Sequence, residues 1–140
     1  PADGKLQFEF NCGGCQNEGW KPYGRLTNIC GSQGFLEFDL ITGTGSITRQ
    51  DLKATPDNNR SLIVTIRTSN DLSLTAFANQ AKLTGTIQLK KAKEYQSVKI
   101  PLDALWKNHS ELKSIKLNFS GDKNTTIEID SIREGSFTQE

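Results

Sequence analysis

The chain has 140 residues, a hydrophobic fraction of 34% and a formal net charge of +1. That length suits one domain with a sizeable core, and the nearly balanced charge argues against a nucleic-acid-binding protein. No apolar run approaches the roughly 18 residues that a membrane span needs. The complete absence of methionine favours a domain excised from a longer chain.

Short segments in which polar and apolar residues alternate follow one another along the chain. Leu62, Val64 and Ile66, for example, share one face of a segment whose other face carries Thr65 and Arg67. Period two with one polar face is typical of an antiparallel sheet with one solvated side. The strands expected on this basis are 6–11, 34–41, 61–68, 72–78, 84–90, 95–102, 112–120 and 125–133. They predict an all-β antiparallel sandwich of the jelly-roll type, formed as a single domain over 1–140.

Turn-forming residues separate these segments at 43–45, 56–59, 69–71 and 121–124. Residues 16–20, after the second cysteine, are expected to form a loop. The one helix-like segment is 101–112, where Asp103 starts a short helical turn.

Three cysteines, Cys12, Cys15 and Cys30, predict one disulfide bridge and one spare thiol. Either Cys12 or Cys15 could pair with Cys30, and the sequence leaves both pairings open. A redox role for Cys12 and Cys15 would need a helix after the motif, and a zinc site would need a further ligand beyond the distant His109. A structural bridge is therefore the preferred interpretation.

Aromatic residues offer candidate binding platforms. Trp20 is expected to plug one end of the core, since large aromatic side chains dominate burial. Trp106 suits the core edge and a binding platform equally well. Tyr23 and Tyr95 are out of phase with their apolar neighbours, so exposed rings are expected. Sugar rings have apolar C–H faces and polar rims, which match such rings combined with hydrogen-bonding side chains.

Cationic residues suggest an anionic ligand. Residues 82–123 carry nine lysines against four acids, a local charge of +5, although a solvated lysine-rich surface is the plainer alternative. A carboxylate or sulfate could be bound by four candidate cations: Arg25, Arg49, Arg67 and Lys99. Arg67 is the foremost of them, because the strand pattern puts it on a polar sheet face.

A structural Ca²⁺ site is a further expectation. Glu9 and Asp130 both project away from apolar neighbours, and they could share a cation if the first and last strands lie side by side. Catalytic patterns are scarce: His109 has no nucleophile motif to serve, and Glu37 and Asp39 lack any mark of a hydrolase pair. The domain itself is therefore expected not to be an enzyme.

Several segments together resemble a known superfamily. These are 8–10, 18–20, 34–38, 62–67 and 127–133, which are similar to the galactose-binding-like jelly-roll modules appended to bacterial glycoside hydrolases, polysaccharide lyases and sulfatases. The resemblance implies a non-catalytic glycan-binding domain, often with a structural calcium ion held at positions that correspond to Glu9 and Asp130. The three cysteines depart from that pattern.

The resulting hypothesis is a secreted, monomeric carbohydrate-binding module that brings an attached enzyme to a polysaccharide, with a preference for uronate or sulfated glycans. Candidate ligand-binding residues are Tyr23, Arg25, Arg49, Arg67, Tyr95, Lys99 and Trp106. A neutral glycan bound by stacking is a close alternative. A protein-interaction or adhesion domain, or a purely structural accessory domain of a secreted enzyme, are the others.

Overall fold

The computed structural model of the chain describes residues 7–8, 19–32, 35–54, 61–83 and 85–135, and for residues 7, 24–32 and 135 the backbone alone. This part of the chain contains ten β-strands and one short helix. They are β1 (Gln7–Phe8), β2 (Trp20–Ser32), β3 (Phe35–Arg49), β4 (Ser61–Thr68), β5 (Leu72–Ala78), β6 (Ala81–Lys82), β7 (Ile87–Leu89), β8 (Gln96–Pro101), α1 (Asp103–Trp106), β9 (Ile115–Gly121) and β10 (Thr125–Gly135).

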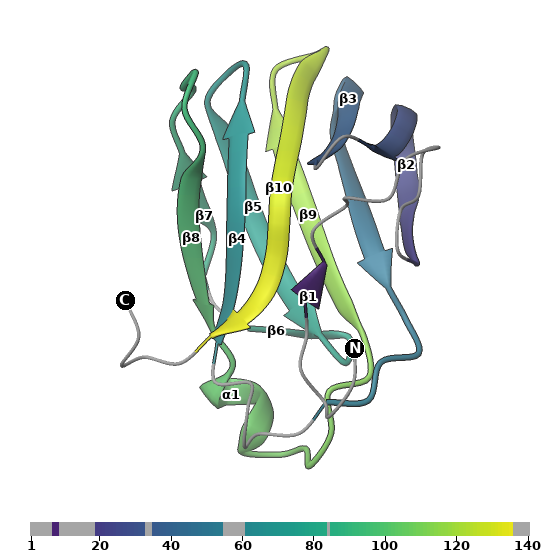
Figure 1. Cartoon of the computed structure of the whole chain (residues 1–140), viewed down its shortest axis with the longest axis vertical. Helices are drawn as coiled ribbons and strands as arrows, with labels where there is room; N and C mark the ends of the chain where they lie inside the picture. Colours follow the sequence, from purple (N-terminus) through teal and green to yellow (C-terminus); the bar gives the residue numbers. More distant parts are fainter. Residues whose placement is uncertain (1–6, 9–18, 33–34, 55–60, 84, 136–140) are drawn as a thin grey trace.

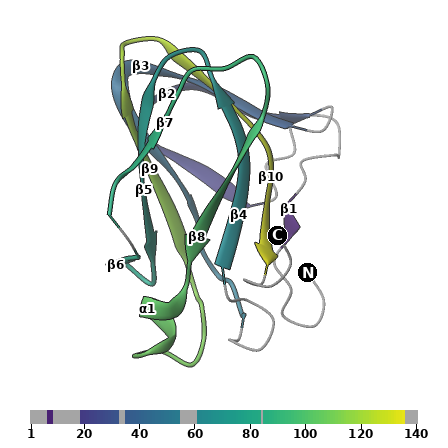
Figure 2. The ribbon, with the colours of Figure 1, turned by 90° about the vertical axis from the view of Figure 1, so that its left-hand side faces the viewer.

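The strands form one antiparallel sheet that curls over into two layers (Figures 1 and 2). The order along it is β6-β5-β9-β3-β10-β4-β8, with β2 beside β3, β1 beside β10 and β7 beside β5. We call the layer of β5, β6, β7, β9 and the adjoining parts of β2 and β3 the front sheet. The layer of β4, β8, β10 and the first part of β3 is the back sheet. The predicted all-β jelly-roll sandwich is confirmed.

Strand β3 belongs to both layers. Its residues 36–40 pair with β10 in the back sheet, and its residues 44–49 pair with β9 in the front sheet. The turn predicted at 43–45 is wrong, because the strand continues through these residues. Gly43 has a φ of +91°, a conformation that glycine adopts without the usual Cβ penalty, and it lies between the two paired stretches.

The loop predicted over 16–20 is wrong at Trp20, where β2 begins, and no strand was predicted over 21–32. Residues 20–32 form β2, which pairs with β3 over most of its length, with two register shifts. Pro22, Gly24 and Asn28 are poor strand formers, so local propensity gave no signal here. The free edge of β3 provides the partner that makes this segment a strand.

The remaining elements agree with the pattern. Segments 61–68 and 72–78 coincide with β4 and β5, and 95–102, 112–120 and 125–133 correspond to β8, β9 and β10 with small shifts. Segment 34–41 is the first half of β3, and 84–90 shortens to β7. Of segment 6–11 the structure describes Gln7 and Phe8. The predicted helical turn begins at Asp103 as expected.

Alternate residues of several strands fill the space between the layers. In β5, Leu72, Leu74, Ala76 and Ala78 are buried, while the residues between them face outward. Trp20 is 1% exposed and meets Phe8 edge-on at 5.6 Å between ring centroids, which confirms its predicted core position. Each such large apolar side chain contributes roughly 1.5–3 kcal/mol through burial.

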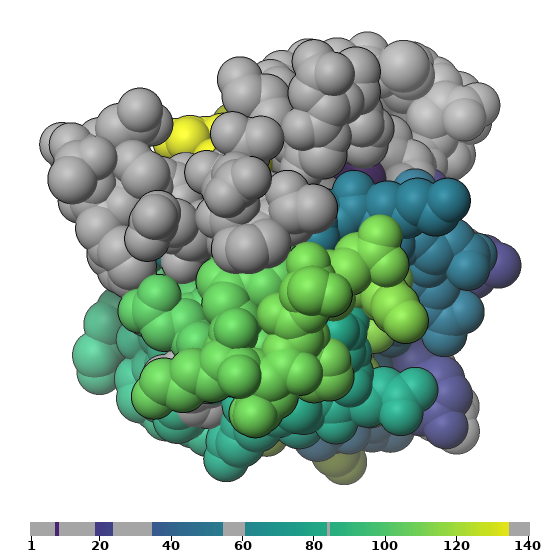
Figure 3. Space-filling model, turned by 90° about the horizontal axis from the view of Figure 1, so that it is seen from below, coloured from purple at the N-terminus to yellow at the C-terminus, as the bar shows by residue number. Residues whose placement is uncertain are grey.

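One end of the sandwich is closed by the segment that contains α1. Leu102, Leu105 and Leu112 from this segment are buried in the core. Figure 3 shows the same segment, in green, spread over the bottom of the molecule. Among the described residues, no helix is long and apolar enough to cross a bilayer.

Candidate functional site

The outer face of the front sheet carries small polar side chains in rows that run across the strands. Residues paired across antiparallel strands project to the same side, so the register defines each row. One row joins Tyr23, Ser46, Asn118 and Thr75. The next row joins Thr44, Ser120, Ser73 and Gln88. Hydroxyl and amide groups from β3, β9, β5 and β7 are therefore gathered on one surface.

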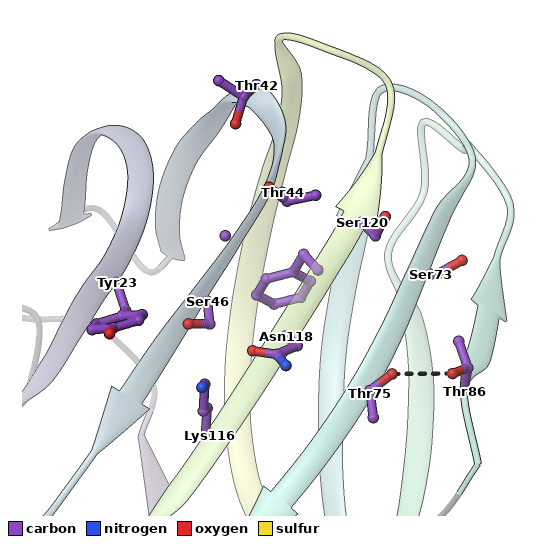
Figure 4. Close-up of a pocket in the computed structure, with 12 residues that line it drawn as sticks. Tyr23, Thr42, Thr44, Ser46, Ser73, Thr75, Thr86, Lys116, Asn118 and Ser120 are labelled. Atoms are coloured by element: carbon purple, nitrogen blue, oxygen red, sulfur yellow. Dashed lines mark hydrogen bonds between the residues drawn. The ribbon is translucent and has the colours of Figure 1, made fainter.

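A groove of about 650 Å³ lies over these rows, which we call the front groove. Figure 4 shows its polar side chains directed into it from neighbouring strands. The Thr75 and Thr86 hydroxyls are 3.2 Å apart, and Ser73 Oγ donates to Gln88 Oε1 at 3.0 Å. Hydroxyl and amide groups both donate and accept hydrogen bonds, so this surface suits a ligand rich in hydroxyl groups.

Tyr23 stands at the edge of the front groove. Its side chain is 71% exposed, and in the described part of the chain no other large hydrophobic residue is exposed. The expectation of an exposed Tyr23 ring is therefore confirmed. The ring also borders a second cavity of about 570 Å³, whose lining includes Lys21, Thr48 and Arg49. Tyr23 thus lies between two hollows of the same face.

Lys116 contributes the positive charge of the front groove. Its Nζ lies 5.4 Å from the ring centroid of Tyr23 and 5.9 Å from that of Phe77, which are cation–π distances. Among the residues that the structure shows lining this groove, Lys116 is the one charged side chain. An ammonium group therefore stands beside the exposed aromatic ring without a carboxylate in the lining to neutralise it.

The predicted ligand residue Arg67 lies on the back sheet, in a polar cluster of its own. Its Nη2 is 2.6 Å from Glu128 Oε1, its Nε donates to the same oxygen at 2.8 Å, and its Nη1 donates to the Lys93 carbonyl at 2.9 Å. The hydrogen bond to Glu128 raises the pKa of Arg67 above its ordinary value. The guanidinium group of Arg67 therefore binds partners within the domain.

Tyr95 belongs to the same cluster. The Arg67 guanidinium carbon lies 4.5 Å from the centroid of the Tyr95 ring, and the Tyr95 hydroxyl donates to Glu128 Oε1 at 3.4 Å. Tyr95 is only partly exposed, and desolvation raises the pKa of its hydroxyl above the ordinary value. The ring that was expected to be a free platform is covered by a guanidinium group.

The other candidate ligand residues are scattered. Arg49 lies beside the second cavity, 5.7 Å from the Phe8 ring, and donates to the Gln50 carbonyl. Lys99 lies on β8 opposite Ile63 in the back sheet, and Trp106 packs half-buried against the core at the end of α1. Arg25 lies on β2, and its side chain is outside the described residues. The six candidates whose side chains are described do not form one site.

The proposed calcium ligands, Glu9 and Asp130, stay a prediction. Phe8 of β1 pairs with Ile132 of β10, so the first described strand does lie beside the last. Asp130 is exposed, at a register shift between Ile129 and Ser131. Glu9 lies outside the described residues. Within the described residues no three His, Cys, Asp or Glu side chains form a metal-binding group.

The predicted disulfide is untested. Cys12 and Cys15 lie outside the described residues. Cys30 lies on β2 opposite Glu37 of β3, and its side chain is not described. Which cysteine pairs with Cys30 stays a prediction.

Sequence reasoning missed most of the front groove. Ser46, Ser73, Thr75, Asn118 and Ser120 are ordinary outward-facing residues when each strand is considered alone. The available signal was that the outward positions of two predicted strands, 72–78 and 112–120, are mostly hydroxyl and amide residues. Their convergence depends on β5 and β9 being neighbours, which the alternation pattern does not show.

Comparison with solved structures finds the same fold in carbohydrate-binding modules of family 29. One variant of such a module has a TM-score of 0.60 and 13% identity, covering 93% of this chain and 91% of that chain. A variant in complex with mannohexaose has a TM-score of 0.59 and 12% identity, covering 93% and 91%. Another, in complex with cellulohexaose, has a TM-score of 0.60 and 12% identity, covering 94% and 92%.

No protein-family model and no curated protein matches the sequence. At 12–13% identity the likeness to solved structures establishes the fold. The predicted resemblance to jelly-roll carbohydrate-binding modules is confirmed at that level.

Proposed function

We propose that this chain is a non-catalytic carbohydrate-binding module and that its glycan lies in the front groove. The observation that carries the proposal is the hydroxyl- and amide-lined groove beside the exposed Tyr23. The fold supports it, since modules that share this fold have been solved with mannohexaose and with cellulohexaose.

The chemistry of the groove suits a sugar chain. The apolar face of a sugar ring can stack on Tyr23, while Asn118 and Thr75 in the same row exchange hydrogen bonds with ring hydroxyls. Because the groove is an open depression across a sheet, the sugar chain can enter and leave at its sides. Such a site suits an internal stretch of a polysaccharide.

The groove lining also supports a binding role over a catalytic one. Hydrolysis of a glycosidic bond generally uses two carboxyl groups that flank the bond. The residues that the structure shows lining the front groove include no carboxylate and no histidine. The role that fits is to hold an attached polysaccharide-degrading enzyme near its substrate by raising the effective concentration. We propose that the parent protein is a secreted bacterial enzyme and that the module acts as a monomer.

The protein-interaction alternative has less support. A docking surface of that kind needs a contiguous apolar patch. In the described part of the chain, Tyr23 is the one large hydrophobic side chain that is exposed, and polar residues surround it.

The original basis for an anionic preference is weaker than the sequence suggested. Arg67 is engaged by Glu128 and by the Lys93 carbonyl on the back sheet. Mannohexaose and cellulohexaose, the sugars in the two complexes, are neutral. Hydroxyl recognition in the front groove serves neutral and acidic glycans alike, so any charge selection has to come from other residues.

Affinity gels cast with neutral, uronate and sulfated polysaccharides test the proposal. The wild-type domain should be retarded on at least one of them, and Tyr23→Ala should reduce the affinity about tenfold, as expected for loss of an aromatic contact. Tyr95→Phe on the back sheet is the matched control and should be retarded like the wild type. Absence of retardation on every glycan, with the domain folded by circular dichroism, would overturn the proposal in favour of a structural domain.

A further inference from the structure

Three lysines lie in one row across the front sheet. Lys21 of β2 is opposite Thr48 of β3, which is opposite Lys116 of β9. Lys116 is in turn opposite Phe77 of β5, which is opposite Lys82 of β6. Residues paired in this way project to the same side of a sheet, so all three ammonium groups belong to the outer face. We call Lys21, Lys116 and Lys82 the lysine row.

The spacing in the lysine row is regular. Lys21 and Lys116 are separated by one intervening strand, and so are Lys116 and Lys82. Since neighbouring strands lie about 4.8 Å apart, successive lysines stem from backbone positions about 10 Å apart. A polymer whose negative charges project to one side at about the same spacing would place successive charges beside successive lysines.

In the described part of the chain, the ion pairs Arg67–Glu128 and Lys90–Asp71 include no member of the lysine row. One acid, Asp51, lines the second cavity together with Lys21, without an ion pair between them. The partners that lie between the lysines in the row are Thr48 and Phe77, which are uncharged. Lys21 and Lys82 are exposed and Lys116 is half-buried.

The other lysines of the basic stretch do not share this arrangement. Lys90, Lys91 and Lys93 precede β8, whereas Lys107 follows it beyond α1. The six residues of β8 span about 20 Å, so these lysines lie towards opposite ends of the molecule. The +5 stretch is therefore not a single patch. Two of its lysines, Lys82 and Lys116, join Lys21 in the lysine row.

Lys116 connects the row with the front groove. Its ammonium group is within cation–π distance of both Tyr23 and Phe77, so two rings restrict its position. Figure 4 shows it below Asn118 and Ser46, on the same face as Tyr23. A sugar that stacks on Tyr23 and carries an acidic group would place that group within reach of Lys116.

We propose that the lysine row gives the module a preference for polysaccharides that bear carboxylate or sulfate groups at regular intervals. This rests on the proposed function, because it assumes that the glycan lies in the front groove. The hydroxyl rows recognise the sugar, and the lysine row selects its charge. The acidic preference then comes from Lys21, Lys82 and Lys116, and not from the arginines of the sequence-based prediction.

The test compares polygalacturonate with neutral glucomannan, each in affinity gels at low and high salt. In the triple variant Lys21→Gln, Lys82→Gln, Lys116→Gln, the affinity for polygalacturonate relative to glucomannan should fall about tenfold. A control triple variant, Lys91→Gln, Lys107→Gln, Lys123→Gln, removes the same charge elsewhere and should keep the wild-type ratio. The double variant Lys21→Gln, Lys82→Gln leaves Lys116 in place and should show an intermediate loss. High salt should lower the wild-type ratio.

Several outcomes would overturn the inference. Equal losses in the row variant and the control variant would show that overall charge alone matters. Equally tight binding of polyglutamate, an anionic polymer without sugars, would show that no glycan is selected. Retardation by glucomannan without any preference for polygalacturonate or sulfated dextran would reject the selective role of the lysine row. The proposed function would still stand. Retardation by none of these glycans would reject both.

Discussion

Arg67 and Glu128 face each other across β4 and β10, and two guanidinium nitrogens share one carboxylate oxygen at 2.6 and 2.8 Å. The Tyr95 ring lies beneath the guanidinium group, and the Lys93 carbonyl accepts a hydrogen bond from Nη1. These contacts tie two strands of the back sheet to the segment that precedes β8. We infer that Arg67 organises this sheet and does not bind the ligand.

Replacing Arg67 should therefore change stability and not glycan binding. We expect Arg67→Ala to lower the melting temperature, because Glu128 loses its ionic partner and the Lys93 carbonyl loses a donor. Retardation in polysaccharide gels, measured below the melting temperature, should match the wild type. Arg67→Lys keeps the charge without the forked geometry and should fall between the two in melting temperature. Loss of retardation at an unchanged melting temperature would contradict this assignment.

The raised pKa of the Tyr95 hydroxyl predicts that the domain loses stability at alkaline pH. Burial is the main cause that raises the pKa of its hydroxyl above the ordinary value of 10.0. A raised pKa in the folded state contributes stability that is complete below the unfolded pKa and is lost as the pH rises through the folded pKa. The melting temperature should accordingly fall above about pH 10, as a phenolate forms beside Glu128.

Tyr95→Phe is the control for that alkaline loss. It removes the titrating hydroxyl and should flatten part of the fall in melting temperature above pH 10. Groups other than Tyr95 contribute a background that the variant retains. Identical alkaline profiles for the two proteins would show that Tyr95 does not contribute to the loss.

A side chain at Gly43, at the bend of β3, should destabilise the fold through the backbone. A Cβ at this position would lie 2.5 Å from the Gly121 carbonyl oxygen, and the φ of +91° disfavours any other residue. Gly43→Ala should lower the free energy of unfolding by about 2 kcal/mol or more, measured by urea denaturation. Gly85→Ala is the matched control, because no atom lies within 4 Å of its added Cβ. Similar costs for both variants would contradict the role of the bend.

Calcium binding by Glu9 and Asp130 remains a prediction that a melting experiment can decide. A cation that binds only the folded state at a hundred times its dissociation constant stabilises that state by about 2.7 kcal/mol. We expect EDTA to lower the melting temperature and added Ca²⁺ to restore it, while Asp130→Asn should be insensitive to both. Equal melting temperatures of the wild type with EDTA and with Ca²⁺ would reject the predicted calcium site.

The sequence was sufficient for most of the fold because period-two alternation reports which side of a strand is buried. β4 and β5 were bounded correctly, and the core position of Trp20 followed from its size. β2 was missed, since its strand conformation depends on the edge of β3 and not on its own propensity. The bend at Gly43 was mistaken for a turn, because glycine permits both and only the partners of β3 distinguish them.

The site was less predictable than the fold, for a related reason. Exposure of Tyr23 followed from its phase relative to apolar neighbours, which is local information. The partners of Arg67 come from β10 and from the segment before β8, distant in the sequence, so its ion pair could not be read from a single strand. The lysine row likewise exists only through the register of β2, β3, β9, β5 and β6.

The continuity of β3 through both layers has a consequence for how the groove moves. Its residues 44–49 support the centre of the groove, while its residues 36–40 are held between β2 and β10 in the other layer. Local opening of the front sheet would therefore disturb strand pairing in both layers of the sandwich. The amides at the groove centre should accordingly exchange with solvent deuterium mainly through global unfolding. The binding surface is then rigid before the ligand arrives, and little conformational entropy is lost when a sugar chain settles on it.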